Sequence, residues 1–300
     1  MRMRLVPTVL ALALAAAAPV LAQQQTDYSK VEIKSEKVAE GLYVLTGQGG
    51  NIGLSAGASG SLVIDDQYAP LSEKILAAIK TLTPGPVRFV VNTHWHGDHT
   101  GGNENMGKAG AILVAHENVR RRMSSEQFLA LFKQKVEASP EAALPVVTFA
   151  EGVTFFWNAD EVRVFHVAPA HTDGDSVIQF VKADVVHMGD TFFNGNYPFI
   201  DTSSGGRVDG IIAAADRVLS AATDKTRIIP GHGPVASKAD LQAYRDTVKA
   251  VRDAVAKLKA EGKTKEAVVA AKPSASYDAK WGQGFIKPDV FVGIVFDSLP

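Results

Sequence analysis

The segment from Thr93 to Gly102 reads THWHGDHTGG and constrains this chain more than any other stretch. It places three of the eight histidines and one aspartate within six positions, a clustering that chance spacing does not explain. In an extended backbone, the side chains of His94 and His96 point to the same side. The glycine that follows permits a tight turn, so Asp98 and His99 can point elsewhere. The segment therefore predicts ligands for two adjacent metal ions.

Three further candidate ligands each follow a strand-like run and lie beside or close to glycine or proline: His171, Asp190 and His232. Turns of this composition can direct side chains from separate strands toward a shared centre. The complete set of five histidines and two aspartates suits two Zn²⁺ ions with an open position for water. Imidazole and carboxylate ligands would also accept Mn²⁺ or Fe²⁺.

Strand-like runs fall into two blocks, and each block is followed by helical segments. Runs between Val31 and Ala115 form the first block, with a helix predicted from Pro70 to about Leu82. The second block runs from Val146 to Met188 and precedes a helix from about Val208 to Ala222. From Lys238 onward the chain is mostly helical. Strands followed twice by covering helices predict an α+β fold with two packed sheets inside and helices outside.

Between the two blocks, the segment Glu126–Glu137 is predicted to be an amphipathic helix because its apolar residues cluster. The cluster contains Phe128, Leu129, Leu131 and Phe132. Two roles are open for this segment: packing in the core, or covering the metal ions as a lid. Trp95, which lies between two ligands, likewise has two roles open, as a wall for the substrate or as packing.

The first 22 residues are predicted to be a secretory signal peptide, with Arg2 and Arg4 before an apolar run from Val9 to Ala18. Cleavage is expected after Ala22, so residues 23–300 would form a single hydrolase domain with a helical C-terminal part. Ten apolar residues are too few to span a bilayer, which requires about 20, so no membrane anchor is expected. Export without cysteine or an N-glycosylation sequon favours a bacterial periplasm.

The overall composition excludes several function classes. The chain is 46% hydrophobic and 21% charged, which is typical of a globular protein, and its formal net charge is −1. No long run of one charge indicates a nucleic-acid surface, so a small-molecule substrate is expected instead. The complete absence of cysteine excludes disulfides, thiolate nucleophiles and cysteine-based zinc fingers.

The ordered motifs THWHGDH, AHT, GD and PGHG resemble those of the metallo-β-lactamase superfamily of binuclear metallohydrolases, over roughly residues 31 to 235. The resemblance implies a four-layer αβ/βα sandwich with the metal site at one edge of the two sheets. It also implies that Asp65 orients a ligand histidine. The ligand roles that it implies are His94, His96 and His171 for one metal ion, Asp98, His99 and His232 for the other, and Asp190 bridging both.

The resemblance implies a hydrolase that cleaves an ester, lactone, thioester or amide bond by a metal-bridging hydroxide. It also implies that Asp98 is catalytic, orienting the hydroxide and then passing a proton to the leaving group. The best-known β-lactamases of the superfamily carry Cys or Ser where this chain has Asp190, and a bridging aspartate is more similar to thioester, lactone and phosphodiester hydrolases. Export nevertheless suits an enzyme that meets β-lactams, so a genuine β-lactamase is an alternative.

Two alternatives without hydrolysis remain: a non-catalytic zinc-binding protein and a flavodiiron oxidoreductase. The second would ordinarily have a glutamate in place of one histidine and a fused flavin domain, which this sequence lacks. Outside the ligand set, His166 and His187 are flanked by apolar strand residues and are predicted to be core imidazoles. His116, at a strand-to-helix junction, is predicted to cap the helix or to support the site.

Overall fold

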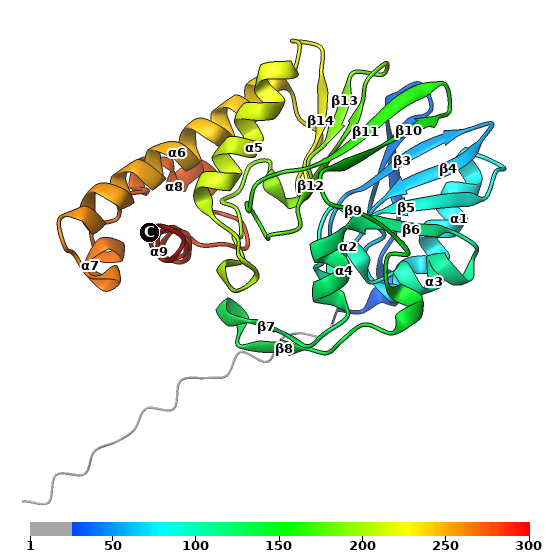
Figure 1. Ribbon diagram of the computed structural model, residues 1–300. Coiled ribbons are helices and arrows are strands. Elements are labelled where there is room, and N and C mark those ends of the chain that lie inside the picture. Colours follow the sequence, from blue (N-terminus) through cyan, green and yellow to red (C-terminus); the bar gives the residue numbers. More distant parts are fainter. Residues whose placement is uncertain (1–25) are drawn as a thin grey trace, which may run out of the picture.

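The structure is a computed structural model that describes residues 26–300 of the chain (Figure 1). The predicted signal peptide, residues 1–22, lies outside the described residues. Within residues 26–300, no helix has the length and apolar character needed to cross a membrane.

The first sheet contains seven strands in the order β1-β2-β3-β4-β5-β6-β9. Their bounds are β1 Lys34–Ala39, β2 Leu42–Thr46, β3 Ile52–Gly57, β4 Gly60–Ile64, β5 Val87–Val91, β6 Ile112–His116 and β9 Val147–Phe149. Neighbouring strands from β1 to β4 pair antiparallel, whereas the pairs β4–β5, β5–β6 and β6–β9 are parallel. Parallel strands end at the same edge of a sheet, so the segments that follow β4 and β5 emerge side by side.

The second sheet contains five strands in the order β10-β11-β12-β13-β14. Their bounds are β10 Gly152–Trp157, β11 Asp160–His166, β12 Ser176–Phe180, β13 Val185–His187 and β14 Arg227–Ile229. The strands from β10 to β13 pair antiparallel, and β13 pairs parallel with β14. The loops that follow β13 and β14 therefore also leave from one edge.

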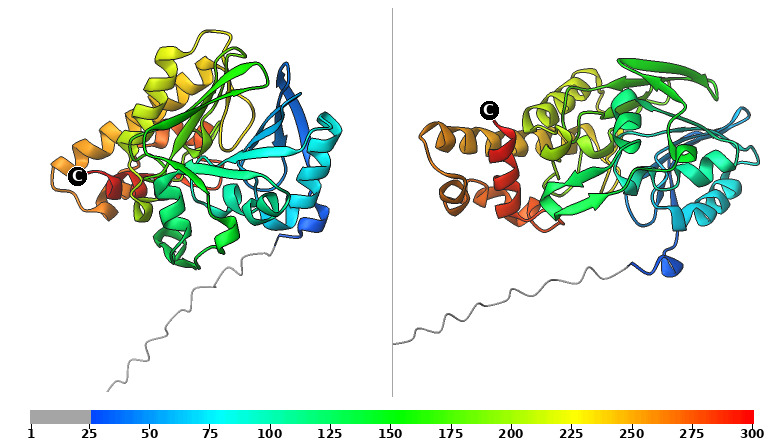
Figure 2. Two further views of the ribbon diagram at one scale, coloured as in Figure 1. Left: turned by 45° about the vertical axis from the view of Figure 1, so that its right-hand side comes forward. Right: turned by 60° about the horizontal axis from the view of Figure 1, so that its bottom comes forward.

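Helices cover the outer face of each sheet, and the sheets pack against each other (Figures 1 and 2). Between the sheets, Leu62 and Ile64 of β4 pack in one buried cluster with Ile178 and Phe180 of β12. On the first sheet lie α1 Ser72–Leu82 and α3 Asn103–Lys108, and on the second lie α5 Val208–Ala221 and α6 Lys238–Ala260. These layers confirm the predicted α+β sandwich of the αβ/βα type.

The remaining helices are α2 Gly97–Thr100, α4 Glu117–Met123, α7 Lys265–Ala270, α8 Ala275–Trp281 and α9 Pro288–Ser298. Figure 1 shows α7, α8 and α9 gathered beside α6 at the C-terminal end of the fold. Phe291 and Val295 of α9 and Val268 of α7 are buried in the same cluster as Val251 and Val255 of α6. The predicted helical C-terminal part is therefore packed onto the second sheet through α6.

The helix predicted over Glu126–Glu137 is wrong. The segment forms a hairpin of β7 Gln127–Leu129 and β8 Gln134–Val136, joined by a short 3-10 turn at Ala130–Phe132. Lys133 adopts a positive φ of 51°, which reverses the chain and is incompatible with a continuing helix. Leu129 and Val136 pack against a buried cluster that includes Trp95, so tertiary packing decides the local structure.

Candidate metal centre

The seven candidate ligands come from four loops, and each loop follows a strand at the same edge of the sandwich. The loop after β5 carries four of them, and the loops after β11, β13 and β14 carry one each. His96 ends the extended part of the first loop and precedes the one-turn helix α2, which contains Asp98 and His99. The structure thus brings all seven predicted residues together.

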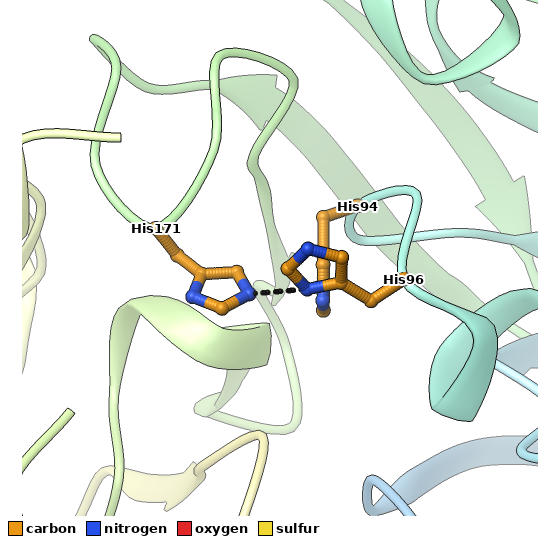
Figure 3. Close-up of side chains that lie close together, drawn as sticks. All are labelled: His94, His96 and His171. Carbon is orange, nitrogen blue, oxygen red and sulfur yellow. Dashed lines mark hydrogen bonds between the residues drawn. The ribbon is translucent and has the colours of Figure 1, made fainter. Parts of the chain in front are cut away.

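Their ligand atoms form three overlapping groups, within each of which all atoms lie within 4.8 Å of one another. These groups are His94, His96 and His171; His94, His99 and Asp190; and Asp98, His99 and His232. In the first group, His96 Nδ1 and His171 Nε2 are only 2.8 Å apart (Figure 3). The overlap of the groups joins all seven ligand candidates in one continuous cluster.

Asp190 lies between the two ends of this cluster. Its Oδ2 atom is 3.5 Å from His171 Nε2 and 3.4 Å from His232 Nε2, and its Oδ1 atom is 3.1 Å from His99 Nε2. A side-chain carbon at Gly231 would lie 2.0 Å from Asp190 Oδ1, so only glycine permits this approach. Asp190 therefore lies within 3.5 Å of ligand candidates at both ends of the cluster.

Four of the imidazoles are held by hydrogen bonds through the ring nitrogen that faces away from the cluster. His99 Nδ1 donates to Asp65 Oδ2 at 2.7 Å, and His171 Nδ1 donates to the Phe199 carbonyl at 2.7 Å. The remaining two pairs are His96 Nε2 with Asp201 Oδ2 at 3.0 Å and His94 Nδ1 with Thr93 Oγ1 at 3.0 Å. Such bonds fix the tautomer and direct the other nitrogen inward.

The ring nitrogens that face the cluster have the properties of metal ligands. With their outer nitrogens protonated, His96 Nδ1 and His171 Nε2 would face each other at 2.8 Å as two lone pairs, an arrangement that a shared cation would stabilise. His94 Nε2 is buried and has no hydrogen-bond partner. Burial lowers the pKa of His94 well below its usual range and that of His171 to about 4, so both rings are neutral, as metal ligation requires.

The other end of the cluster is more strongly charged. Burial opposes the charged form of His232, but Asp190 and Asp98 outweigh it and raise its pKa to about 9. Burial likewise opposes ionisation of Asp98, but His99 and His232 lower the pKa of this carboxyl group to about 2. The carboxylates that favour a proton on His232 when no cation is bound would instead compensate the charge of a bound cation, which would replace that proton.

Asp65 supports this arrangement from a strained backbone position. It follows β4, has a positive φ of 61° and is fully buried. Its carboxylate accepts from Thr93 N, Thr93 Oγ1 and His99 Nδ1, each at 2.7 Å. Strain of this kind concentrates at functional sites, where surrounding contacts maintain it. This geometry matches the supporting role that the resemblance implies for Asp65.

Sequence reasoning missed Asp201, which lies 105 positions from the histidine that it holds. Its Oδ2 atom accepts from His96, while its Oδ1 atom accepts from the backbone of Ser203 and Ser204. No strand-like run precedes Asp201, and a turn aspartate is an ordinary feature of a loop. Only the contact with His96 reveals what this residue does.

The three histidines outside the ligand set have structural roles. His187 is buried in the core, where its Nε2 atom donates to the Asn51 carbonyl at 3.1 Å. His116 caps α4 by accepting from Asn118 N. His166 is half-buried and stacks on His116 instead of packing in the core. Trp95 is 4% exposed and packs in a buried cluster, which confirms its packing role, and it also lines the cleft described next.

A cleft of about 700 Å³ opens onto the cluster. Four candidate ligands line its floor: His96, Asp98, Asp190 and His232. Its walls are rich in aromatic side chains from distant segments, namely Tyr68, Trp95, Phe132, Phe193, Tyr197, Phe199 and Phe285. Phe193 stacks on His232 with ring centroids 5.2 Å apart. The candidate metal centre is therefore accessible to a small molecule.

Comparison with known proteins assigns the family. Residues 50–258 match the Metallo-beta-lactamase superfamily, and the chain belongs to it. Over 111 residues the chain is 25% identical to a hydroxyacylglutathione hydrolase of Pelagibacter ubique (strain HTCC1062), a match that covers 36% of this chain and 37% of that protein.

Solved structures of the same fold agree. A metallo-beta-lactamase from Pontibacter korlensis has a TM-score of 0.60 and 21% identity, covering 73% of this chain and 99% of that one. The sec-alkylsulfatase Pisa1 from Pseudomonas sp. has a TM-score of 0.66 and 18% identity, covering 88% of this chain and 50% of that one. At these identities the likeness establishes the fold alone.

Proposed function

We propose that this protein is an exported, zinc-dependent hydrolase with two metal ions, acting on an ester, lactone, thioester or amide bond of a small molecule. The observation that carries the proposal is the overlap of three ligand groups on the floor of an open cleft. His94, His96 and His171 would hold one ion. The other ion would be held by Asp98, His99 and His232, with Asp190 shared between the two. When bound, two Zn²⁺ ions would lower the pKa of water to about 7 and polarise the scissile bond.

The chain's own residues would orient the attacking water, transfer protons and hold the ligand histidines in place. Asp98 is half-buried at the cleft floor, with Oδ2 3.3 Å from His232 Nε2. Its pKa of about 2 keeps it ionised near neutral pH, so its carboxylate can accept a hydrogen bond from the attacking water and orient it. Transfer of a proton to the leaving group is the further role that the family resemblance implies for Asp98. Asp65 and Asp201 would hold His99 and His96 in the ligating tautomer.

The cleft offers no alternative nucleophile of the serine or cysteine type. Among the described residues that line it, none is serine, threonine or cysteine. We therefore propose hydrolysis by direct attack of water, with no covalent acyl-enzyme. A trapped acyl-enzyme detected by mass spectrometry would contradict this step.

We also propose that residues 23–300 act as one hydrolase domain after removal of residues 1–22. Phe285, from the loop between α8 and α9, lines the same cleft as the metal-ligand candidates. The helical C-terminal part thus contributes to the proposed site as well as to the core.

One experiment tests the proposal. The purified protein is loaded with zinc, its metal content is measured, and it is assayed against nitrocefin, lactones, thioesters and phosphodiesters before and after chelation. We expect about two zinc ions per chain and hydrolysis that chelation abolishes and zinc restores. Fewer than two ions in fully loaded protein would contradict the two-metal centre. Two bound ions without hydrolysis of any substrate would favour the non-catalytic zinc-binding alternative.

A further inference from the structure

Aromatic rings form a continuous wall from a candidate metal ligand to the mouth of the cleft. Phe199 stacks on His96, with centroids 5.7 Å apart and ring planes 21° apart. Phe132 lies 5.1 Å from Phe199, and Phe285 lies 5.6 Å from Phe132. Exposure rises along this series, from 9% for Phe199 to 37% for Phe132 and 76% for Phe285. The wall therefore becomes accessible with distance from the metal-ligand candidates.

Three segments that are far apart in the sequence build this wall. Phe132 comes from the turn of the β7–β8 hairpin, Phe199 from the loop after β13, and Phe285 from the loop between α8 and α9. The hairpin is held toward this wall by Ala130 N, which donates to Ser203 Oγ at 3.2 Å. Large exposed phenyl rings that converge at a cleft mouth are unfavourable in water unless a ligand covers them.

Away from its floor, the cleft has no positively charged lining residue in the part of the chain that the structure describes. None of the described residues that line it is lysine or arginine. Lys133 follows Phe132 but is exposed and does not line the cleft, and Lys287 donates to the Gln283 carbonyl. A carboxylate that entered the outer cleft would lose hydration without gaining an ion pair, which is costly.

We infer that the outer cleft selects substrates whose group remote from the scissile bond is apolar or aromatic and uncharged, with Phe132 and Phe285 as specificity-determining residues. This inference rests on the proposed function and assigns its substrate class. Any anionic part of the substrate would then have to lie at the candidate metal centre, where bound cations would compensate its charge. Phe199 supports both the ring of His96 and the phenyl group of Phe132, so it couples the two parts of the cleft.

Two thiols that share one anchoring group provide the test: 3-phenylpropane-1-thiol and 4-mercaptobutanoate. A thiol binds zinc as its thiolate, so the two probes differ mainly in the group presented to the outer cleft. Their dissociation constants are measured by calorimetry on the zinc-loaded protein, whose metal content is determined separately. We expect the phenyl compound to bind about tenfold more tightly or better, a difference of about 1.4 kcal/mol.

Variants assign this preference to the two phenylalanines. Phe132→Ala and Phe285→Ala should each weaken the phenyl compound severalfold and leave 4-mercaptobutanoate unchanged. Phe285→Arg should reverse the preference by supplying the missing cation. Phe128→Ala is the matched control, because Phe128 is 57% exposed on the same hairpin and does not line the cleft. Lys133→Gln should leave both affinities unchanged.

The outcomes separate the inference from the proposed function. A zinc-loaded protein that binds both thiols equally, or prefers the carboxylate, would overturn the inference alone. Equal effects of Phe128→Ala and Phe132→Ala would also overturn the assignment to the cleft wall. Failure to bind zinc would contradict the proposed function and the inference together.

Discussion

The floor and the outer wall of the cleft are built in opposite ways. On the floor, four of the seven candidate ligands come from one short segment after β5, and each is buried or half-buried. Hydrogen bonds to Asp65, Asp201, Thr93 and a backbone carbonyl fix four of the imidazoles. The outer wall is assembled instead from a hairpin and two loops, and its rings are progressively exposed.

The difference separates the chemistry from the choice of substrate. A metal centre tolerates little displacement, because its ligands must meet one ion with fixed distances and angles. An aromatic wall contributes by area, and neighbouring rings can compensate for one another. We therefore expect substitutions on the floor to change turnover or metal affinity, and substitutions on the wall to change KM.

The largest effect is expected from Asp98→Asn. The amide cannot accept a proton, so kcat should fall about 100-fold or more, the scale of a positioned acid–base group. Because Asp98 is also a candidate ligand, wild type and variant must be compared at equal measured metal content. A variant with both metal ions and full turnover would show that Asp98 is a ligand without a role in proton transfer.

Asp201→Asn is expected to have a smaller effect. It should lower the affinity for zinc and change the rate of the chemical step little. Asparagine can keep the Oδ1 contacts with Ser203 N and Ser204 N but replaces the Oδ2 acceptor of His96 by an amino group. Loss of such a partner typically weakens metal binding about 10-fold to 100-fold. Zinc affinity measured by competition with a chelator, and the absorption spectrum of the cobalt-substituted protein, would report the change.

Zinc affinity equal to that of wild type, with an unchanged cobalt spectrum, would mean that Asp201 only caps its turn. Turnover at saturating zinc should fall much less than in Asp98→Asn. Asp201→Ala serves as a harsher comparison, because it removes the cap as well and is expected to reduce stability.

Much of the floor could be predicted from the sequence, because its ligands occupy one dense motif and short turns after strands. The strand patterns predicted most elements within a few residues, although β1 begins at Lys34 and not at Val31. The support that Asp201 gives to His96 could not be predicted, since it depends on where a distant loop settles. Local signals describe a residue's neighbours in the chain and not its neighbours in space.

The wall could not be predicted for a related reason. The apolar spacing of Glu126–Glu137 fits a helix, but the segment gains more by pairing Gln127 with Val136 and placing Leu129 against the Trp95 cluster. Nothing in the sequence near Phe285 indicates that it meets Phe132. Long-range packing decides both features, and it overrides weak local preferences.

An intermediate prediction concerns the base of the hairpin. Leu129 lines the cleft and packs against the Trp95 cluster, so Leu129→Ala removes apolar surface from the cleft and should also loosen the hairpin that carries Phe132. We expect KM for an aromatic substrate to rise about threefold to tenfold with kcat nearly unchanged, as for a loss of uniform binding. Leu131→Ala is the control, since Leu131 is 40% exposed and does not line the cleft. Equal KM values for the Leu129→Ala and Leu131→Ala enzymes would contradict this role of Leu129 in the aromatic wall.

The smallest effect is expected outside the cleft, at a second pair of histidines. His116 and His166 stack with centroids 3.8 Å apart and ring planes 12° apart. Burial, and then the neighbouring His166, lower the pKa of His116, while a hydrogen bond to the backbone of Ala150 and the charges of Glu117 and Asp173 raise it to a lesser degree. The imidazoles of the metal centre lie beside buried carboxylates, whereas this pair has no buried carboxylate within hydrogen-bond distance among the described contacts.

The sign of the pH dependence follows from this lowered pKa. In the unfolded chain the pKa of His116 returns to about 6.5, so protons favour the unfolded state. The stacked pair therefore contributes stability that is present above about pH 6.5 and is lost as pH falls through the folded pKa.

His116→Asn removes the titrating ring but keeps an N-cap acceptor for Asn118 N. Between pH 7.5 and pH 5.5, the free energy of unfolding should therefore fall less in the variant than in wild type. Any loss of metal in acid would affect both proteins alike, so the difference between them isolates the His116 ring. Equal losses of stability would show that this ring does not contribute to the acid sensitivity.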